Sequence, residues 1–165
     1  MNQTQLENSF VIAFADYADA IFRFCMVKVS NVELAEDMTQ EVFTRYWQYL
    51  RDGKEMTNTR SFLYTIANNM AKDWYKKKKS DSLDQKMDAG SQPKDTASDP
   101  ETIASYQEVL NTMQDLKPKD AEILFLTHVE GLSPKEIAEI VPESVNTISV
   151  RLNRATKRLQ KKLHV

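Results

Sequence analysis

Apolar side chains recur every three or four residues along most of the chain, which is the spacing of one face of an α-helix. The first such run covers residues 6–30, and its apolar positions are Phe10, Phe14, Tyr17, Ile21, Phe24 and Val27. Ser30 and Asn31, two residue types that favour helix N-termini, precede a second helical run. Asp52 and Gly53 are expected to end it.

A third helix is expected from about Arg60 to Lys78, and it has two different faces. Its apolar stripe consists of residues four apart, namely Phe62, Ile66, Met70 and Trp74. Its other face is polar and basic, and it holds Asn68, Asn69, Lys72, Tyr75, Lys76, Lys77, Lys78 and Lys79. Lysines beside aromatic rings are typical of surfaces that bind single-stranded nucleic acid, because phosphates meet the cations and bases stack on the rings. An ordinary solvated face, with Trp74 packed in the core, is the alternative interpretation.

Residues 80–103 interrupt this helical pattern. The segment is rich in Ser, Asp, Gly and Pro and has few large apolar side chains. Such a composition predicts a flexible linker. The chain is therefore expected to be all-α, with two small helical domains at residues 1–79 and 104–165.

The second domain has the pattern of a helix-turn-helix. Pro118 opens a helix that Gly131 closes. The residues Ser133-Pro134-Lys135-Glu136 form a capping box that starts a short helix, and Pro142 ends it. Ser144 is placed to cap the last helix. A short helix, a tight turn and a long basic helix form the motif that binds the DNA major groove.

The last helix is strongly amphipathic. Its apolar stripe consists of Ile148, Leu152, Ala155, Leu159 and Leu163. Its opposite face has no acidic residue and carries Arg151, Arg154, Lys157, Arg158, Lys161 and Lys162. Its first turns are expected to face base edges and phosphates, and the later lysines to position the helix rather than read sequence. Helical hairpins with a basic face also occur in proteins that bind no DNA, so this alternative stays open.

The charges are unevenly distributed, although the 165-residue chain has 22 basic and 24 acidic side chains and a net charge of −2. Residues 60–79 hold six basic side chains and one acidic, and residues 144–165 hold six and none. Two basic blocks in an acidic chain indicate two contacts with a polyanion such as nucleic acid.

Composition argues against several other classes of protein. Cys25 is the single cysteine, and no group of metal-ligating residues has the spacing of a metal site. Only His128 and His164 are available as histidines, so neither a helical hydrolase nor a histidine phosphotransfer protein is favoured. We therefore expect no enzyme activity, no cofactor and no small-molecule substrate. The absence of a long apolar run and of signal-peptide character predicts a cytoplasmic chain that does not insert into a membrane.

A conventional transcription regulator, with this helix-turn-helix on an unrelated sensor domain, is the main rival hypothesis. Such a regulator would need a dimer surface and would bind a palindromic site by itself. The basic block at residues 60–79 argues against a mere sensor domain.

Four stretches of sequence carry a resemblance to a known family. They are Ala35–Phe43, which contains Asp-x-x-Gln-Glu-Val-Phe, Arg60–Tyr75 followed by four lysines, Gly131–Ala138, and Ser144–Ala155. Together and in this order, they resemble an extracytoplasmic-function (ECF) sigma factor, a class of bacterial RNA polymerase initiation factor. The resemblance implies that residues 1–79 are sigma domain two and residues 104–165 are sigma domain four.

The resemblance also implies partners and roles. Asp37, Gln40 and Glu41 would dock on the clamp helices of the polymerase β′ subunit, and the second domain would meet the β flap. Asn69 would help to hold a flipped base of the minus-ten promoter element, beside a base-capturing loop at about residues 52–59. The other polar and basic residues of the third helix would hold the displaced strand. An anti-sigma factor would hold the protein inactive.

The helix-turn-helix would bind the minus-35 element. The candidate contacts are Asn146, Thr147, Ser149, Val150, Arg151, Asn153, Arg154, Lys157 and Arg158. Relatives often have Lys or Arg where Ser149 stands, Gly where Asn146 stands, and Leu-Gly-x where this chain has Val141-Pro142-Glu143. The minus-35 sequence is therefore not carried over from the resemblance.

Overall fold

The computed structural model describes residues 1–84, 101, 104, 108, 111 and 115–162. The described residues contain helices and turns and no strand, which confirms the all-α prediction. The chain divides into two compact units, Met1–Ser98 and Asp99–Val165. Most of the expected linker, and the last apolar position Leu163, lie outside the described residues. No helix in the described part is both long and apolar enough to cross a membrane.

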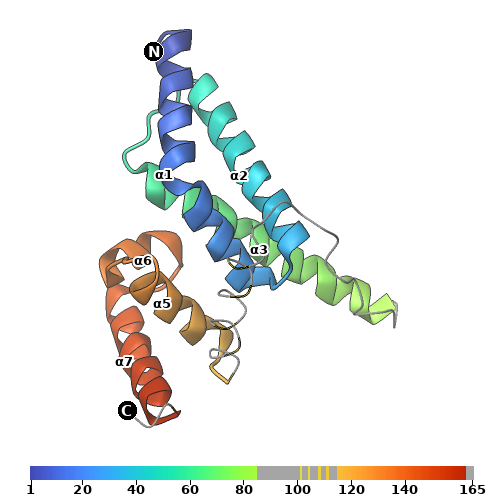
Figure 1. Ribbon diagram of the computed structural model, residues 1–165, viewed down its shortest axis with the longest axis vertical. Helices are drawn as coiled ribbons and strands as arrows, with labels where there is room; N and C mark the ends of the chain where they lie inside the picture. The colour runs from blue at the N-terminus through green and yellow to red at the C-terminus, as the bar shows by residue number, and fades with distance from the viewer. Residues whose placement is uncertain (85–100, 102–103, 105–107, 109–110, 112–114, 163–165) are drawn as a thin grey trace. The chain divides into compact units, whose positions relative to one another are not determined.

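The first unit packs α1 (Gln3–Val29), α2 (Val32–Arg51) and α3 (Thr59–Asp84) against one another (Figure 1). Its core is formed by fully buried side chains from each helix, among them Ile21, Phe24, Val42, Leu63 and Tyr64. The ring of Phe24 packs edge-on against that of Tyr64, with 5.3 Å between centroids. The predicted apolar stripes match this core only in part. In α3 the buried face is Leu63, Tyr64, Ala67 and Ala71, while the predicted stripe of Phe62, Ile66, Met70 and Trp74 lies beside it and is half-buried; in α1, Phe14 is 48 % exposed.

Local signals set the helix boundaries of this unit. Asn31 caps α2, since its side chain accepts a hydrogen bond from the amide of Leu34 at 2.9 Å. Ser30 instead ends α1 in the left-handed conformation, at φ 50°. Gly53, at φ +69°, ends the turn after α2 at the expected place.

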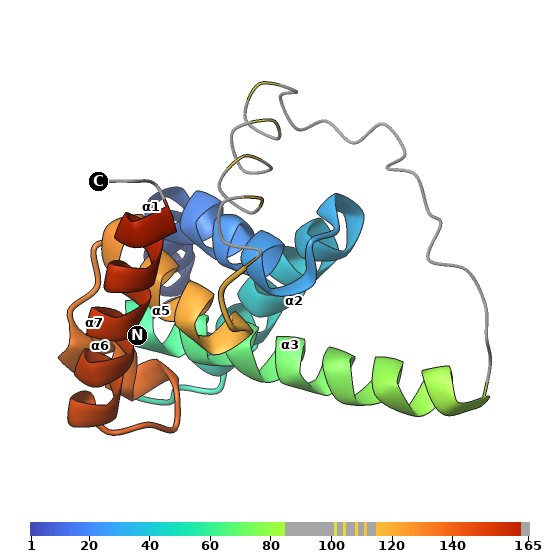
Figure 2. The ribbon, with the colours of Figure 1, turned by 90° about the horizontal axis from the view of Figure 1, so that it is seen from below.

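The third helix is longer than expected. It begins at Thr59 and continues to Asp84, so the first five residues of the predicted linker are helical. No glycine or proline stands between Gly53 and Gly90, and lysine is a good helix former, so nothing in this stretch breaks the helix. The C-terminal half of α3 extends past α1 and α2 (Figure 2).

The second unit contains α5 (Pro118–His128), α6 (Pro134–Ile140) and α7 (Val145–Lys162). The capping box of α6 is present in full: the Glu136 amide donates to the Ser133 hydroxyl at 3.2 Å, and the Ser133 amide donates to the Glu136 carboxylate at 2.9 Å. Ile137 of α6 and Ile148 and Ala155 of α7 are fully buried in the core of this unit. The short helix, tight turn and long helix confirm the predicted helix-turn-helix.

Candidate polymerase and nucleic-acid interfaces

The outer face of α2 carries the residues expected to bind polymerase. Asp37 and Gln40 are exposed, one turn apart, while Met38 and Val42 on the inner face are buried in the core. Glu41 is part-buried and forms an ion pair with Arg45 at 2.9 Å, one turn further on. The helix therefore presents an acidic and amide surface that the unit's own packing leaves uncovered.

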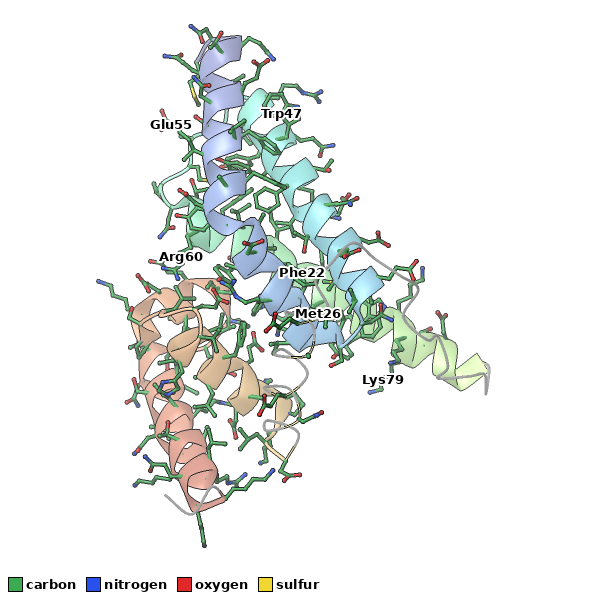
Figure 3. All side chains as sticks on the ribbon, viewed as in Figure 1. Phe22, Met26, Trp47, Glu55, Arg60 and Lys79 are labelled. Atoms are coloured by element: carbon green, nitrogen blue, oxygen red, sulfur yellow. The ribbon has the colours of Figure 1, made fainter. Side chains whose placement is uncertain are left out.

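The outer face of α3 is basic and open to solvent. The exposed side chains on it are Asn69, Lys72, Lys76, Lys77, Lys78 and Lys79. Tyr75 is half exposed, and its hydroxyl donates to the carbonyl oxygen of Lys28. Lys79 points away from the body of the unit (Figure 3). Four consecutive lysines on a projecting helix create a strong positive potential suited to a polyanion.

Asn68 does not belong to this surface. Its side chain is 1 % exposed and lies in the core of the unit, whereas Asn69 next to it is exposed. Successive residues on a helix point about 100° apart, so one of two neighbouring asparagines can face inward while the other faces out. The prediction that Asn68 contacts DNA is therefore wrong for the described conformation.

The sequence left open whether Trp74 packs in the core or belongs to a nucleic-acid surface, and its position in the structure is intermediate. The side chain is half-buried rather than fully packed in the core. Its ring packs edge-on against Tyr75, with 4.8 Å between centroids, and the Lys78 ammonium stands 4.8 Å above it. Cation–π contact with the indole holds this lysine near the ring.

The loop between α2 and α3 is fixed by an aromatic anchor that the sequence analysis missed. The Tyr49 hydroxyl donates to the carbonyl oxygen of Glu55 at 2.8 Å, and the Lys54 ammonium lies 5.5 Å from the Tyr49 ring centroid. The same ring packs on Phe62 of α3, with 4.6 Å between centroids. A groove of about 830 Å³ runs between this loop and α1, with Ile12 and Met56 among its lining residues.

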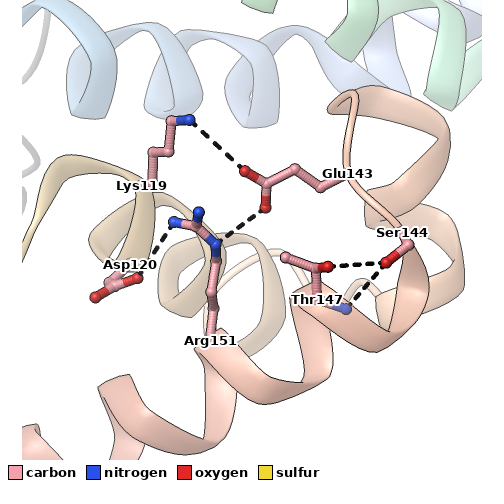
Figure 4. Close-up of polar contacts among 6 residues, drawn as sticks. All are labelled: Lys119, Asp120, Glu143, Ser144, Thr147 and Arg151. Atoms are coloured by element: carbon pink, nitrogen blue, oxygen red, sulfur yellow. Dashed lines mark hydrogen bonds and ion pairs between the residues drawn. The ribbon is translucent and has the colours of Figure 1, made fainter.

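The first turns of α7 present the candidate minus-35 surface. The exposed candidates are Asn146, Thr147, Ser149, Val150, Asn153, Arg154, Lys157 and Arg158. Thr147 also completes the cap of the helix, because its amide donates to the Ser144 hydroxyl at 3.2 Å (Figure 4). The predicted role of Ser144 as the cap is thus confirmed.

Arg151 is placed differently from the exposed candidate contacts of α7, because it is part-buried. Its guanidinium forms ion pairs with Asp120 of α5 and with Glu143 of the turn before α7 (Figure 4). The face that looked free of acid along the helix therefore receives carboxylates from other segments, two at Arg151 and one, Asp115, at Lys162. No periodicity within α7 could have revealed them.

Metal-ligating side chains and Cys25 provide neither a metal site nor a reactive thiol in the described part of the chain. No group of three or more His, Cys, Asp or Glu side chains there is arranged to hold a metal ion. Cys25 is buried, and that burial raises the pKa of its thiol to about 12, which removes its nucleophilic thiolate at neutral pH.

The sequence matches two family models that describe sigma-70 factors. Residues 13–80 match Sigma-70 region 2, and residues 106–159 match Sigma-70, region 4. The chain is 31 % identical over 166 residues to the ECF RNA polymerase sigma factor SigW of Bacillus subtilis, covering 92 % of this chain and 89 % of that one. It is 25 % identical over 154 residues to the RNA polymerase sigma factor YlaC of the same organism, covering 91 % and 89 %.

Two solved structures have a similar fold. One is the sigma factor RpoE in complex with the anti-sigma factor NepR from Bartonella quintana, with a TM-score of 0.73 and 24 % identity over 95 % of this chain and 98 % of that one. The other is CnrH in complex with the cytosolic domain of CnrY, with a TM-score of 0.68 and 21 % identity over 96 % and 89 %. The chain belongs to the ECF sigma factor family, whose members are transcription initiation factors and not enzymes.

Proposed function

We propose that this chain binds core RNA polymerase through the outer face of α2 and directs it to promoters with two DNA elements. The observation that carries the proposal is the pair of exposed basic helices, α3 and α7, which stand on separate units of an acidic chain. One unit would take the minus-ten element and the other the minus-35 element, and the polymerase would hold both at the right spacing.

The two DNA contacts differ in chemistry. The helix α7 is the second helix of the helix-turn-helix, and its exposed side chains are polar and basic. This arrangement suits the major groove of duplex DNA. On α3, a row of lysines beside Tyr75 and Trp74 suits the phosphates and unstacked bases of a displaced strand. Asn69, exposed on this row, would hydrogen-bond a flipped base.

The energy for opening comes from capture of bases and neutralisation of phosphates. Unstacking a base costs a few kcal/mol, which a base pocket and phosphate contacts offset. Each phosphate neutralised on a single strand contributes about 0.7 to the slope of log K against log salt, and on a duplex about 0.9. Neither unit alone is expected to bind DNA tightly. When polymerase holds both units, binding of the first raises the effective concentration of the second at its DNA element.

The proposed partner surface on α2 can be tested by reversing charge. Asp37→Lys places a cation on the exposed face and is expected to abolish co-elution with core polymerase. Asp19→Lys makes the same change in charge at an exposed site on α1 and serves as the matched control. Equal co-elution of both variants would remove α2 from the polymerase interface.

Transcription tests the function as a whole. Purified chain and bacterial core polymerase are expected to give discrete start sites on a genomic promoter library, each requiring both proteins. Aligning these promoters would yield the two elements. No start sites, together with no co-elution with core polymerase, would overturn the proposal.

The solved complex of RpoE with the anti-sigma factor NepR suggests a mode of control. We extend it to this chain and place its action in the cytoplasm, where core polymerase operates. The chain isolated from its own cells is then expected to carry an inhibitory protein whose removal restores run-off transcription. If the chain freshly isolated from uninduced cells were fully active in run-off transcription, this mode of control would be contradicted.

A further inference from the structure

Arg151 is the residue of α7 whose surroundings do not match a role in reading DNA. Its Nε lies 3.2 Å from Oε2 of Glu143, and its Nη1 lies 3.8 Å from Oδ1 of Asp120. Lys119 joins the same cluster, with its Nζ 3.7 Å from Oε1 of Glu143 (Figure 4). Two cations and two carboxylates thus form a neutral cluster beside the candidate DNA surface.

The carboxylates of this cluster are largely withdrawn from water. The side chains of Asp120 and Glu143 are 12 % and 17 % exposed, and that of Arg151 is 29 % exposed. The next arginine along the helix, Arg154, is by contrast exposed. Partly buried charges are costly unless they are paired. Asp120 is paired with Arg151, and Glu143 is paired with Arg151 at 3.2 Å and, more distantly, with the exposed Lys119 at 3.7 Å.

The cluster connects three segments of the helix-turn-helix. Asp120 stands in the first turn of α5, Glu143 stands in the turn between α6 and α7, and Arg151 stands in the second turn of α7. The cap of α7 by Ser144 immediately follows Glu143 in the chain. Arg151 therefore holds α7 against the rest of the unit at the end that enters the major groove.

Moving Arg151 to a base edge would also work against binding. Two carboxylates would lose their guanidinium partner next to a helix that approaches DNA phosphates, and only the exposed Lys119 would remain to pair with Glu143. Their repulsion of the phosphates would offset the gain from a contact with guanine.

We propose that Arg151 is a positioning residue of the minus-35 interface: it neutralises Asp120 and Glu143 and fixes α7, and it reads no base. The inference rests on the proposed function, because it concerns the same DNA surface. Base preference at the minus-35 element then resides in the exposed side chains of α7, and Arg151 affects only how well all of them are presented.

The decisive experiment compares three variants of the full chain in holoenzyme. Arg151→Met removes the charge and keeps a long side chain. The triple variant Arg151→Met, Asp120→Asn, Glu143→Gln removes the charge and both carboxylates. Arg154→Ala, on the exposed face, is the matched control for a residue that contacts DNA. Each is measured by competition among promoters in which every minus-35 base pair is substituted in turn.

The expected pattern separates positioning from reading. Arg151→Met weakens binding to every promoter by the same factor, and the triple variant regains most of that loss with wild-type base preference and wild-type salt slope. A residue that reads guanine would instead lose roughly 5- to 150-fold discrimination at one base pair. A residue that only contacts a phosphate would lower the salt slope by about 0.9, with no recovery in the triple variant. Either of these last two results overturns the proposal.

A second measurement works on the free chain and does not need polymerase. Arg151→Met is expected to speed amide hydrogen exchange at Thr147 and Ile148, whose amides donate to Ser144, and the triple variant is expected to restore their protection. Unchanged exchange in Arg151→Met overturns the positioning role. If the wild-type chain fails to initiate transcription, the proposed function fails, and the exchange experiment still decides whether Arg151 holds α7.

Discussion

The hydroxyl of Tyr49 donates a hydrogen bond to the carbonyl oxygen of Glu55 at 2.8 Å, which ties the last turn of α2 to the loop before α3. The Tyr49 ring also packs on Phe62 and faces the Lys54 ammonium. This side chain therefore holds the loop at Lys54 and Glu55, within the segment of about residues 52–59 that is expected to capture a promoter base.

Tyr49→Phe removes this hydrogen bond and keeps the ring. We expect the free energy of opening the loop to fall by about 1 kcal/mol, because a typical hydrogen bond contributes about that much. The loop should therefore open more often. Amide exchange at Gly53, whose amide donates to the carbonyl oxygen of Leu50, should accelerate, and holoenzyme should bind a single-stranded minus-ten oligonucleotide more weakly. Tyr17→Phe, which removes a hydroxyl from α1 beside the same groove, is the control. Equal loop exchange in both variants would show that the Tyr49 hydroxyl does not hold the loop.

Asn68 and Asn69 offer a matched pair of substitutions. The buried Asn68 is expected to affect stability, and the exposed Asn69 is expected to affect DNA binding. Asn68→Ala removes a side chain that is 1 % exposed, so a loss of roughly 1–3 kcal/mol in unfolding free energy is expected. Asn69→Ala changes an exposed residue, and its unfolding free energy should stay within about 0.5 kcal/mol of wild type. Both tryptophans, Trp47 and Trp74, lie in the first unit, so tryptophan fluorescence follows its unfolding.

The same pair tests base capture during promoter opening. Asn69→Ala is expected to reduce permanganate reactivity of the melted bases more than it reduces the closed complex, because a flipped base exists only after opening. An equal loss in the two assays would mean that Asn69 acts before the strands separate.

Periodicity and local capping signals were sufficient to predict most of the helices. Helical periodicity depends on residues three or four positions apart in the sequence. Capping boxes and turn residues also lie within a few positions of one another. The cap at Ser133 and the break at Gly53 are examples in which the deciding atoms are close in sequence. The end of α3 was missed, because a polar composition that suits a linker also suits a solvated helix.

Contacts between distant segments could not be predicted in this way. Arg151 looks like its neighbours along α7, and only the fold brings Asp120 and Glu143 to it. Asn68 and Asn69 are the same residue type, and the rotation of α3 against α1 and α2 decides which one faces the core. Tyr49 showed no signal beyond an aromatic near a turn, since its partner is a backbone carbonyl.

The capping box of α6 gives a prediction about the start of the helix-turn-helix. Ser133→Ala removes the acceptor for the Glu136 amide, so α6 should lose about 1 kcal/mol of stability. Amide exchange at residues 136–140 should rise accordingly. Ser149→Ala is the control, because its hydroxyl donates to the Val145 carbonyl inside α7 and alanine favours a helix interior. A similar effect of both substitutions would argue against the cap.

Cys25 makes the stability of the first unit depend on pH in the alkaline range. Burial raises the pKa of its thiol from 9.0 to about 12, against smaller opposing effects of a hydrogen bond with Thr39 and the charge of Lys28. The unfolded chain therefore releases this proton near pH 9, while the folded chain keeps it. Above that pH the unfolded state binds fewer protons, so stability falls as pH rises.

The contribution of Cys25 to the unfolding free energy is expected to be complete below about pH 9. Above that pH the unfolding free energy falls, with a slope that approaches about 1.4 kcal/mol per pH unit. Burial also raises the pKa of Tyr46, which adds to the loss above about pH 10, so the interval between pH 9 and 10 isolates Cys25. Denaturant unfolding followed by tryptophan fluorescence should show this fall in the wild-type chain. Cys25→Ala should be less stable at pH 8, because it leaves a cavity in the core, but its stability should change little between pH 9 and 10. The same slope in both chains would assign the pH dependence to another group.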